Sequence, residues 1–159
     1  MYTKGEMVVY PIYGAGIIED IQINIIDGEN IAYYVLVLPI GELKILVAVE
    51  NADKVGLRQV MLSNDLQNLM ICTKNRPLAM QDNWNLRYKE HMEMIKSGNL
   101  QDIAEVFRNL RLREKAKGLS SAEKKMLSNV KQILLSEIML SFEVERDKAE
   151  EILADCINC

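Results

Sequence analysis

The sequence predicts an α+β protein in which a small twisted β-barrel is followed by a compact all-α domain. Residues 1–60 alternate short runs of β-branched and aromatic residues with turn residues, a spacing typical of small barrels. Near Gly56 the hydrophobic period changes to a helical one, which continues towards the C-terminus. The 159 residues fit one or two small domains, and an apolar content of 49% is sufficient for packed cores. We therefore expect two domains, at residues 1–60 and 61–159.

Four strands are expected in the first domain. Met7 to Tyr10 forms the first strand, which Pro11 ends because proline has no amide hydrogen to donate. The second strand precedes Asp27-Gly28, a strong signal for a hairpin turn. The later strands are expected over residues 17–25, 31–38 and 43–49, with a turn at residues 39–42 between the last two.

Five helices are expected in the second domain. The first three run from Asn64 to Cys72, from Trp84 to about Ser97, and from Leu100 to about Lys117. Gly98 and Gly118 follow two of them, because glycine tolerates the left-handed conformation that ends a helix. A capping box, Ser120-Ser121-Ala122-Glu123, opens a fourth helix that extends to about Phe142. The last helix places four apolar residues on one face: Ala149, Ile152, Leu153 and Cys156.

Composition excludes several classes of protein. No apolar run approaches the roughly 18 residues of a membrane span. The N-terminus lacks the apolar stretch of a secretory signal. Three cysteines without framework spacing argue against a disulfide scaffold. We therefore expect a cytoplasmic protein with no membrane partner.

A convergent catalytic site cannot be assembled from the sequence. The single histidine, His91, lies in the middle of a predicted helix, where a structural role is the simpler interpretation. Cys156-x-x-Cys159 matches half of a zinc motif, but four ligands would require Cys72 and His91 to converge on it. We predict a protein that is not an enzyme and has no cofactor or metal. A rival hypothesis is a small metal-dependent enzyme that uses these cysteines or the acidic tail: Glu143, Glu145, Asp147, Glu150 and Glu151.

The charge is distributed unevenly along the chain. The net charge is −4, yet residues 84–131 carry eleven Lys and Arg against six Asp and Glu, which gives +5. Residues 1–63 carry four against eight, which gives −4, and residues 132–159 carry two against seven, which gives −5. A basic segment inside an acidic chain is compatible with contact to nucleic acid.

The only tryptophan, Trp84, begins this basic segment. Asp82 or Asn83 can cap the helix that Trp84 opens. A large ring flanked by cations at a helix start could lie against bases while the cations hold phosphate. The same ring also continues an apolar stripe with Tyr88, Met92 and Ile95, and such stripes usually face a core. Both interpretations stay open from the pattern alone.

The chain resembles the CarD/CdnL family of bacterial transcription regulators over nearly its whole length. Motifs similar to the family's N-terminal domain are Val8-Val9-Tyr10-Pro11, Gly14, Tyr34-Val35-Leu36, Glu50-Asn51-Ala52 and Val55-Gly56. Motifs similar to its C-terminal domain are Asn83-Trp84, Arg87-Tyr88-Lys89, Ser97-Gly98, Ala104-Glu105-Val106, Gly118-Leu119-Ser120, Glu123-Lys124, Met126-Leu127 and Gln132-Ile133-Leu134. Each motif is weak alone, but their joint order and spacing are specific.

The resemblance implies a fold and a function. The first domain would be a Tudor-like barrel that docks on the β subunit of RNA polymerase. The helical domain would bind promoter DNA at the upstream edge of the melted region, largely independently of sequence. Trp84 would wedge into the minor groove, and basic residues would contact the backbone: Arg87, Lys89, Lys124 and Lys125. The result would be a longer-lived open complex, stabilised by a monomeric protein.

The sequence departs from the family pattern in the last barrel strand. The resemblance implies an arginine there that contacts polymerase, but Leu46 occupies its place. Lys44 would point to the same side of the strand and could replace the arginine. Lys44 and Leu46 are therefore the predicted polymerase contacts. The alternative function is a protein-interaction adaptor without DNA contact, which would lack the salt dependence that phosphate contacts cause.

Overall fold

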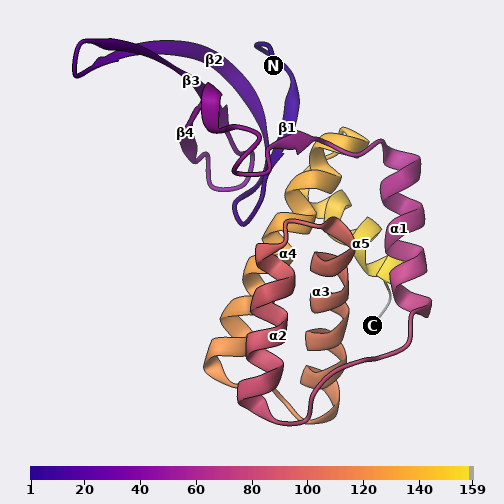
Figure 1. The fold of residues 1–159 in the computed structure, drawn as a ribbon. Helices are drawn as coiled ribbons and strands as arrows, with labels where there is room; N and C mark the ends of the chain where they lie inside the picture. The colour runs from indigo at the N-terminus through magenta and orange to yellow at the C-terminus, as the bar shows by residue number, and fades with distance from the viewer. Residues whose placement is uncertain (158–159) are drawn as a thin grey trace.

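The computed structural model of the protein describes residues 1–157 (Figure 1). The strands are β1 (Met7–Tyr10), β2 (Gly14–Ile26), β3 (Glu29–Val37), β4 (Lys44–Ala48) and β5 (Arg58–Gln59), with a 3-10 turn at Val49–Asn51. The helices are α1 (Ser63–Asn75), α2 (Trp84–Lys96), α3 (Leu100–Ala116), α4 (Ser121–Phe142) and α5 (Arg146–Ile157). The predicted α+β class is therefore confirmed.

The sheet is antiparallel and open, with the strand order β4-β3-β2-β1-β5. The small barrel that the sequence predicted is not closed, because β4 and β5 do not pair with each other within residues 1–157. β5 contains only two residues, Arg58 and Gln59, and is too short to extend the ladder. The same brevity explains why its hydrophobic pattern was not recognisable in the sequence. β4 and β5 consequently form the two edges of the sheet.

A long hairpin of β2 and β3 extends away from the rest of the molecule (Figure 1). Its turn is Asp27-Gly28, and both residues have positive φ angles, 52° and 82°, as a type I′ turn requires. A bulge between Ile18 and Asp20 shifts the register of the pair. Beyond the bulge, Ile23 and Ile25 are exposed by 68% and 75% of their surface. The hairpin therefore presents apolar side chains that the protein itself does not cover.

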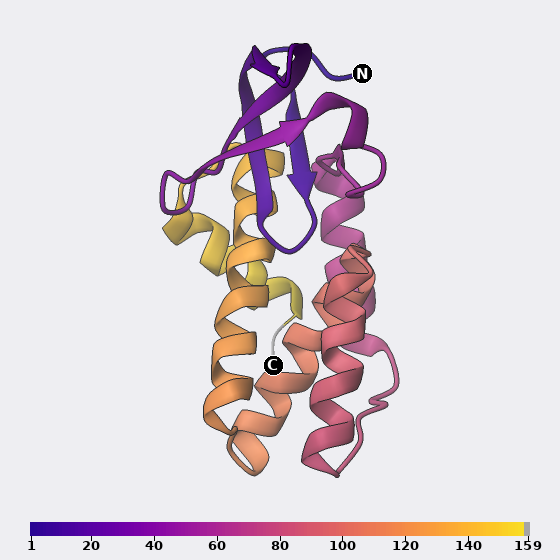
Figure 2. The same cartoon turned by 60° about the vertical axis from the view of Figure 1, so that its left-hand side comes forward.

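Each part of the chain has its own hydrophobic core. The sheet packs Val8, Ile18, Tyr34 and Leu36 together with residues of the loops that follow β4. The helices pack around α4, which contacts α1, α3 and α5 and lies beside α2 in both views (Figures 1 and 2). α4 also contacts β2, so the sheet sits against one end of the helical bundle.

Side-chain caps begin three of the helices, and the sequence indicated two of these caps, at Asn83 and Ser120. Asn83 Oδ1 accepts a hydrogen bond from the Leu86 amide at 3.2 Å, and Asn99 Oδ1 accepts one from Gln101 at 2.8 Å. Ser120 Oγ accepts one from the Glu123 amide at 3.2 Å. These bonds satisfy first-turn amides that have no partner inside the helix.

The only histidine, His91, lies in the helical core and is 3% exposed. Its Nε2 lies 3.3 Å from Asn109 Nδ2, and its Nδ1 has no hydrogen-bond partner among the described residues. Burial lowers the pKa of His91, although the nearby Glu123 carboxylate opposes this shift. His91 is therefore a neutral structural side chain, as the sequence analysis expected.

A close approach between Gly16 of β2 and the backbone of Val37 in β3 generates a prediction. A Cβ added to Gly16 would lie 2.6 Å from the Val37 carbonyl oxygen, and the backbone there cannot move without breaking the sheet. Gly16→Ala should lower the free energy of unfolding by about 1–3 kcal/mol in denaturant titrations. Ile23→Thr, on the exposed part of the same strand, should change it by less than about 0.5 kcal/mol. Equal stability of the two variants would contradict the assigned register.

The burial of His91 generates a second prediction, on pH. Because its pKa is lower in the folded chain, the unfolded chain binds more protons below the ordinary value of 6.5. The contribution of neutral His91 to the free energy of unfolding should be fully present above that pH. It should be lost as the pH is lowered towards the folded pKa, by up to about 1.4 kcal/mol per pH unit. His91→Leu should remove most of this dependence in urea titrations between about pH 7.5 and pH 5.5. An unchanged pH slope in the variant would contradict the assignment.

Candidate nucleic-acid interface

Trp84 stands at the first position of α2 and is exposed. The residue is 43% exposed, so the core interpretation of Trp84 is wrong. Its indole stacks on Tyr88 one turn later, with ring centroids 5.5 Å apart and planes inclined by 19°. The indole Nε1–H donates a hydrogen bond to Ser120 Oγ at 2.8 Å. Two contacts therefore hold a solvent-exposed aromatic ring in one orientation.

Ser120 connects Trp84 to the buried interior. Its hydroxyl accepts from the indole and from the Glu123 amide, and it donates to Glu123 Oε1 at 3.2 Å. A hydroxyl has one donor and two acceptor sites, so the bonding capacity of Ser120 is complete. The cap of α4 therefore also supports the exposed ring.

A buried ion pair lies directly behind this support. Arg87 Nε and Nη2 donate to the two carboxylate oxygens of Glu123, each at 2.9 Å, and the two side chains are 2% and 1% exposed. The hydrogen bond from Arg87 lowers the pKa of Glu123, and the same bond raises the pKa of Arg87, so both groups are charged. Arg87 Nη1 also donates to the carbonyls of Gln81 and Asp82. The pair thereby joins α2, α4 and the loop that precedes Trp84.

The structure corrects the role predicted for Arg87. The resemblance implied a contact between this side chain and the DNA backbone, but its guanidinium is enclosed and its donors are directed at Glu123 and at backbone carbonyls. Breaking the pair would leave a buried charge unpaired, which is strongly unfavourable. Arg87 is therefore a residue that positions Trp84. The sequence could not indicate this, because Glu123 is 36 residues away in the chain.

The other predicted cations are exposed. Lys89 lies on α2, and Lys124 and Lys125 lie in the first turns of α4. α2 and α4 begin at the end of the bundle that lies away from the sheet, where α3 also ends (Figure 2). Lys117, which the sequence pattern did not single out, also lies at this end, and its Nζ is 3.9 Å from Asp82 Oδ1. Its position in the turn that follows a helix was the available signal.

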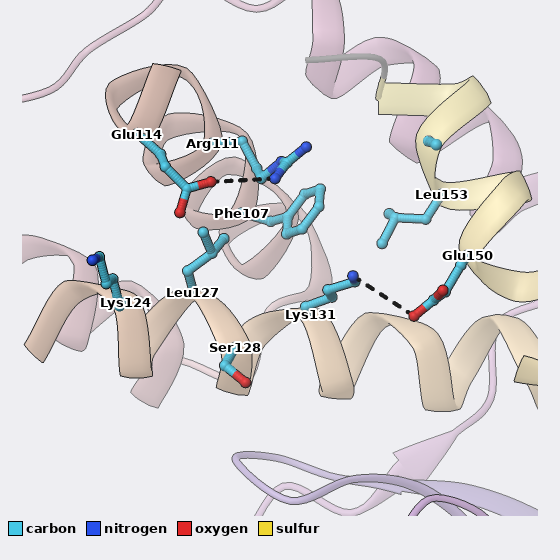
Figure 3. A pocket seen from close by; sticks show the side chains of 10 residues that line it. Phe107, Arg111, Glu114, Lys124, Leu127, Ser128, Lys131, Glu150 and Leu153 are labelled. Carbon is cyan, nitrogen blue, oxygen red and sulfur yellow. Dashed lines mark hydrogen bonds and ion pairs between the residues drawn. The ribbon is translucent and has the colours of Figure 1, made fainter. Parts of the chain in front are cut away.

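Lys124 also borders a cavity of about 370 Å³ between α3, α4 and α5. Figure 3 shows the apolar floor, formed by Phe107, Leu127 and Leu153. At its rim Arg111 pairs with Glu114 at 3.3 Å, and Lys131 pairs with Glu150 at 3.7 Å (Figure 3). These cations are partly neutralised by their own partners, so the cavity adds little positive potential to the Trp84 end.

The predicted polymerase contacts lie on an edge of the sheet. Lys44 and Leu46 belong to β4, whose outer edge is unpaired in the described structure. Lys44 Nζ forms an exposed ion pair with Glu19 at 2.9 Å, and Leu46 is 50% exposed. Both side chains are accessible to a partner.

The groups considered for metal chemistry are not assembled in the described residues. No three His, Cys, Asp or Glu side chains in residues 1–157 lie close enough together to bind a metal ion. Cys156 is buried on α5, and burial raises the pKa of its thiol, whereas Cys159 lies outside the described residues. The helices of the described chain include none with the length and apolar content needed to cross a bilayer.

Comparison with known proteins identifies the family. A family model described as "CarD-like/TRCF RID domain" matches residues 2–61, and one described as "CarD, C-terminal domain" matches residues 68–154. The chain is 33% identical over 138 residues to the "Putative transcription factor YdeB" of Bacillus subtilis (strain 168), across 87% of this chain and 90% of that protein. The chain therefore belongs to the CarD family of transcription factors and carries, at residues 2–61, a domain of the family's RNA polymerase interaction type.

Proposed function

We propose that this chain is a non-enzymatic regulator that bridges RNA polymerase and promoter DNA and stabilises the open complex. Residues 1–60 bind the β subunit of the polymerase, and residues 61–159 bind the upstream fork of the melted region. The protein acts as a monomer in the bacterial cytoplasm. The observation that carries the proposal is an exposed tryptophan held rigidly at the end of the bundle away from the sheet, with exposed lysines beside it.

The geometry of Trp84 favours a ring that wedges against a base pair over one that recognises a particular base by hydrogen bonding. Its Nε1–H, the one hydrogen-bond donor of the indole, is already bonded to Ser120. Tyr88 covers one face of the ring. The opposite face and the edge are available to stack against a base pair at the fork, where they oppose closure of the bubble. Such a contact responds to shape and stacking, so sequence preference should be slight.

The support beneath Trp84 makes the wedge effective. A side chain that is ordered before binding loses less conformational entropy when it binds. Arg87 and Glu123 hold the starts of α2 and α4 together, while Lys89, Lys124 and Lys125 remain exposed for the phosphates on either side. Phosphate contacts position a protein on DNA without reading its sequence. In this site the lysines thus contact phosphates, whereas the aromatic ring of Trp84 stacks on a base pair.

Several features of the sheet support docking to polymerase. β4 has an unpaired edge that carries Lys44 and Leu46, and the β2–β3 hairpin exposes Ile23 and Ile25. An accessible strand edge can pair with a strand of another protein, and exposed apolar side chains add contact area.

One observation favours the adaptor function as a second candidate. An apolar cavity of about 630 Å³ lies between α2 and α4, lined by Tyr88, Met92, Ile95 and Met126. A protein segment could occupy such a groove. Binding of fork DNA that does not weaken with salt, or no DNA binding at all, would favour this candidate.

The main test is Trp84→Ala in the full chain. One aromatic contact with a base is worth about 1–3 kcal/mol, so the open-complex lifetime should shorten by about one to two powers of ten. Trp84→Phe should retain only part of the lifetime, because its ring can still stack on a base pair but has no Nε1–H to bond Ser120. Glu93→Ala, exposed on the same helix, is the matched control and should leave the lifetime unchanged. Normal decay with Trp84→Ala, at an unchanged melting temperature, would refute the wedge.

A second test concerns Lys44. If its ammonium contacts an acidic group of the polymerase, Lys44→Ala should weaken binding severalfold at low salt and less at high salt, because ions screen exposed charges. Leu46→Ala should weaken binding equally at both salt concentrations. Lys54→Ala, exposed elsewhere in the sheet domain, is the control. Equal low-salt affinities of the wild type and Lys44→Ala would exclude this contact.

A further inference from the structure

The sheet and the helical bundle are joined by buried polar groups in the middle of α4. Ser136 Oγ accepts a hydrogen bond from the Ala15 amide at 2.9 Å. The next residue, Glu137, accepts from Arg58 Nη1 and Nη2 at 2.8 and 2.9 Å. We call these four residues the interdomain contact: Ala15 and Arg58 from the sheet, Ser136 and Glu137 from α4.

The interdomain contact is fully enclosed on the helical side. Ser136 is 2% exposed and Glu137 is 0% exposed, whereas the Arg58 side chain is 29% exposed. The Met61 amide donates a further bond to Glu137 Oε1 at 2.9 Å. A buried carboxylate is stable only while it is paired and hydrogen-bonded, so one relative orientation of the two parts is strongly favoured.

The backbone of the β1–β2 turn is fitted closely against the helices. A Cβ added to Gly14 would lie 2.6 Å from Ser136 Oγ, and one added to Gly98 would lie 3.0 Å from the Pro11 ring. Ile12, between Pro11 and Gly14, has a φ of 80°, which is unusual for a β-branched side chain. Such strain persists only where the surroundings determine the conformation. The turn is therefore held in place by the helices on which it packs.

One straight element connects this contact to Trp84. Ser120, the cap of α4, bonds the indole, and Ser136 lies sixteen residues later on the same helix. At 1.5 Å per residue these two points are about 24 Å apart. A hydrogen-bonded helix keeps that separation nearly constant. The orientation of the sheet is thereby transmitted to the exposed ring.

We propose that Ser136 and Glu137 are positioning residues that fix the direction of Trp84 relative to the polymerase-binding sheet. This inference rests on the proposed function and adds that the bridge must be rigid. With the sheet docked, a fixed orientation presents the ring to the fork at a high effective concentration. If several orientations were populated, only a fraction of bound molecules would place the wedge correctly.

The experiment uses the full chain with Glu137→Gln and, separately, Ser136→Ala. Glu137→Gln keeps the side-chain shape but removes the charge, and Ser136→Ala removes the acceptor of the Ala15 amide. Ile103→Val, in the helical core, is the control for a purely structural loss of stability. Affinity for polymerase, affinity for fork DNA alone and open-complex lifetime are measured for each. The relative orientation of the sheet and the helical bundle is measured as a distance between two spin labels. One label is on Cys72 of α1 and the other is on the cysteine introduced by Ile25→Cys in β2, and Cys156→Ala and Cys159→Ala remove the other two cysteines.

We expect Glu137→Gln and Ser136→Ala each to broaden the distribution of distances between the labels and to shorten the open-complex lifetime by about threefold or more. Their affinities for polymerase and for DNA should stay within about twofold of wild type, because neither binding surface is altered. Ile103→Val should change neither distances nor lifetime. Unchanged distances in both variants, or broadened distances with a normal lifetime, would overturn the proposal. So would a loss of lifetime matched by an equal loss of either affinity. Failure of the wild-type chain to bind DNA would instead refute the proposed function, while the label distances would still test the rigidity.

Discussion

A carboxylate removed from water must be paired, and α4 buries two of them, Glu123 and Glu137. Each accepts both ends of an arginine fork from another part of the chain, Arg87 of α2 and Arg58 of β5. The two sites are fourteen residues apart, about four helical turns. One organises the exposed tryptophan, and the other joins the sheet. The long helix is thus tied to the Trp84 end of the bundle and to the sheet by the same chemistry.

We infer that these pairs contribute specificity more than net stability. Bringing two charges into the interior costs several kcal/mol of hydration, which their attraction only partly restores, so similar apolar side chains would often be as stable. Apolar contacts, however, tolerate sliding and repacking, whereas a bidentate pair has one geometry. A protein whose proposed task is to hold a ring at a defined place on a large assembly benefits from that geometry. The saturated hydroxyl of Ser120 adds the same directional restraint at the surface.

Much of the fold could be predicted because its signals are local. Asp27-Gly28 forms the predicted hairpin turn, and the caps at Asn83 and Ser120 begin helices at the expected residues. These signals arise from backbone conformations and hydrogen bonds within a few residues, which is the range over which a sequence pattern is informative. The sequence could not show that the predicted barrel is left open, because closure depends on whether distant edge strands meet. β5 has only two residues, which is too few to show the alternating hydrophobic pattern of a strand.

In the candidate site, too, some features follow from the sequence and others only from the tertiary structure. The sequence by itself determined the family, the α+β class, the elements and the identity of the residues near Trp84. Tertiary structure alone decided which of them face water. Trp84 and Arg87 lie three residues apart on one helix, and their burial is the reverse of what hydrophobicity suggests: the aromatic ring is exposed and the cation is enclosed. The physical reason is that α4 brings Glu123 to Arg87 and Ser120 to the indole, and no local pattern contains that partner.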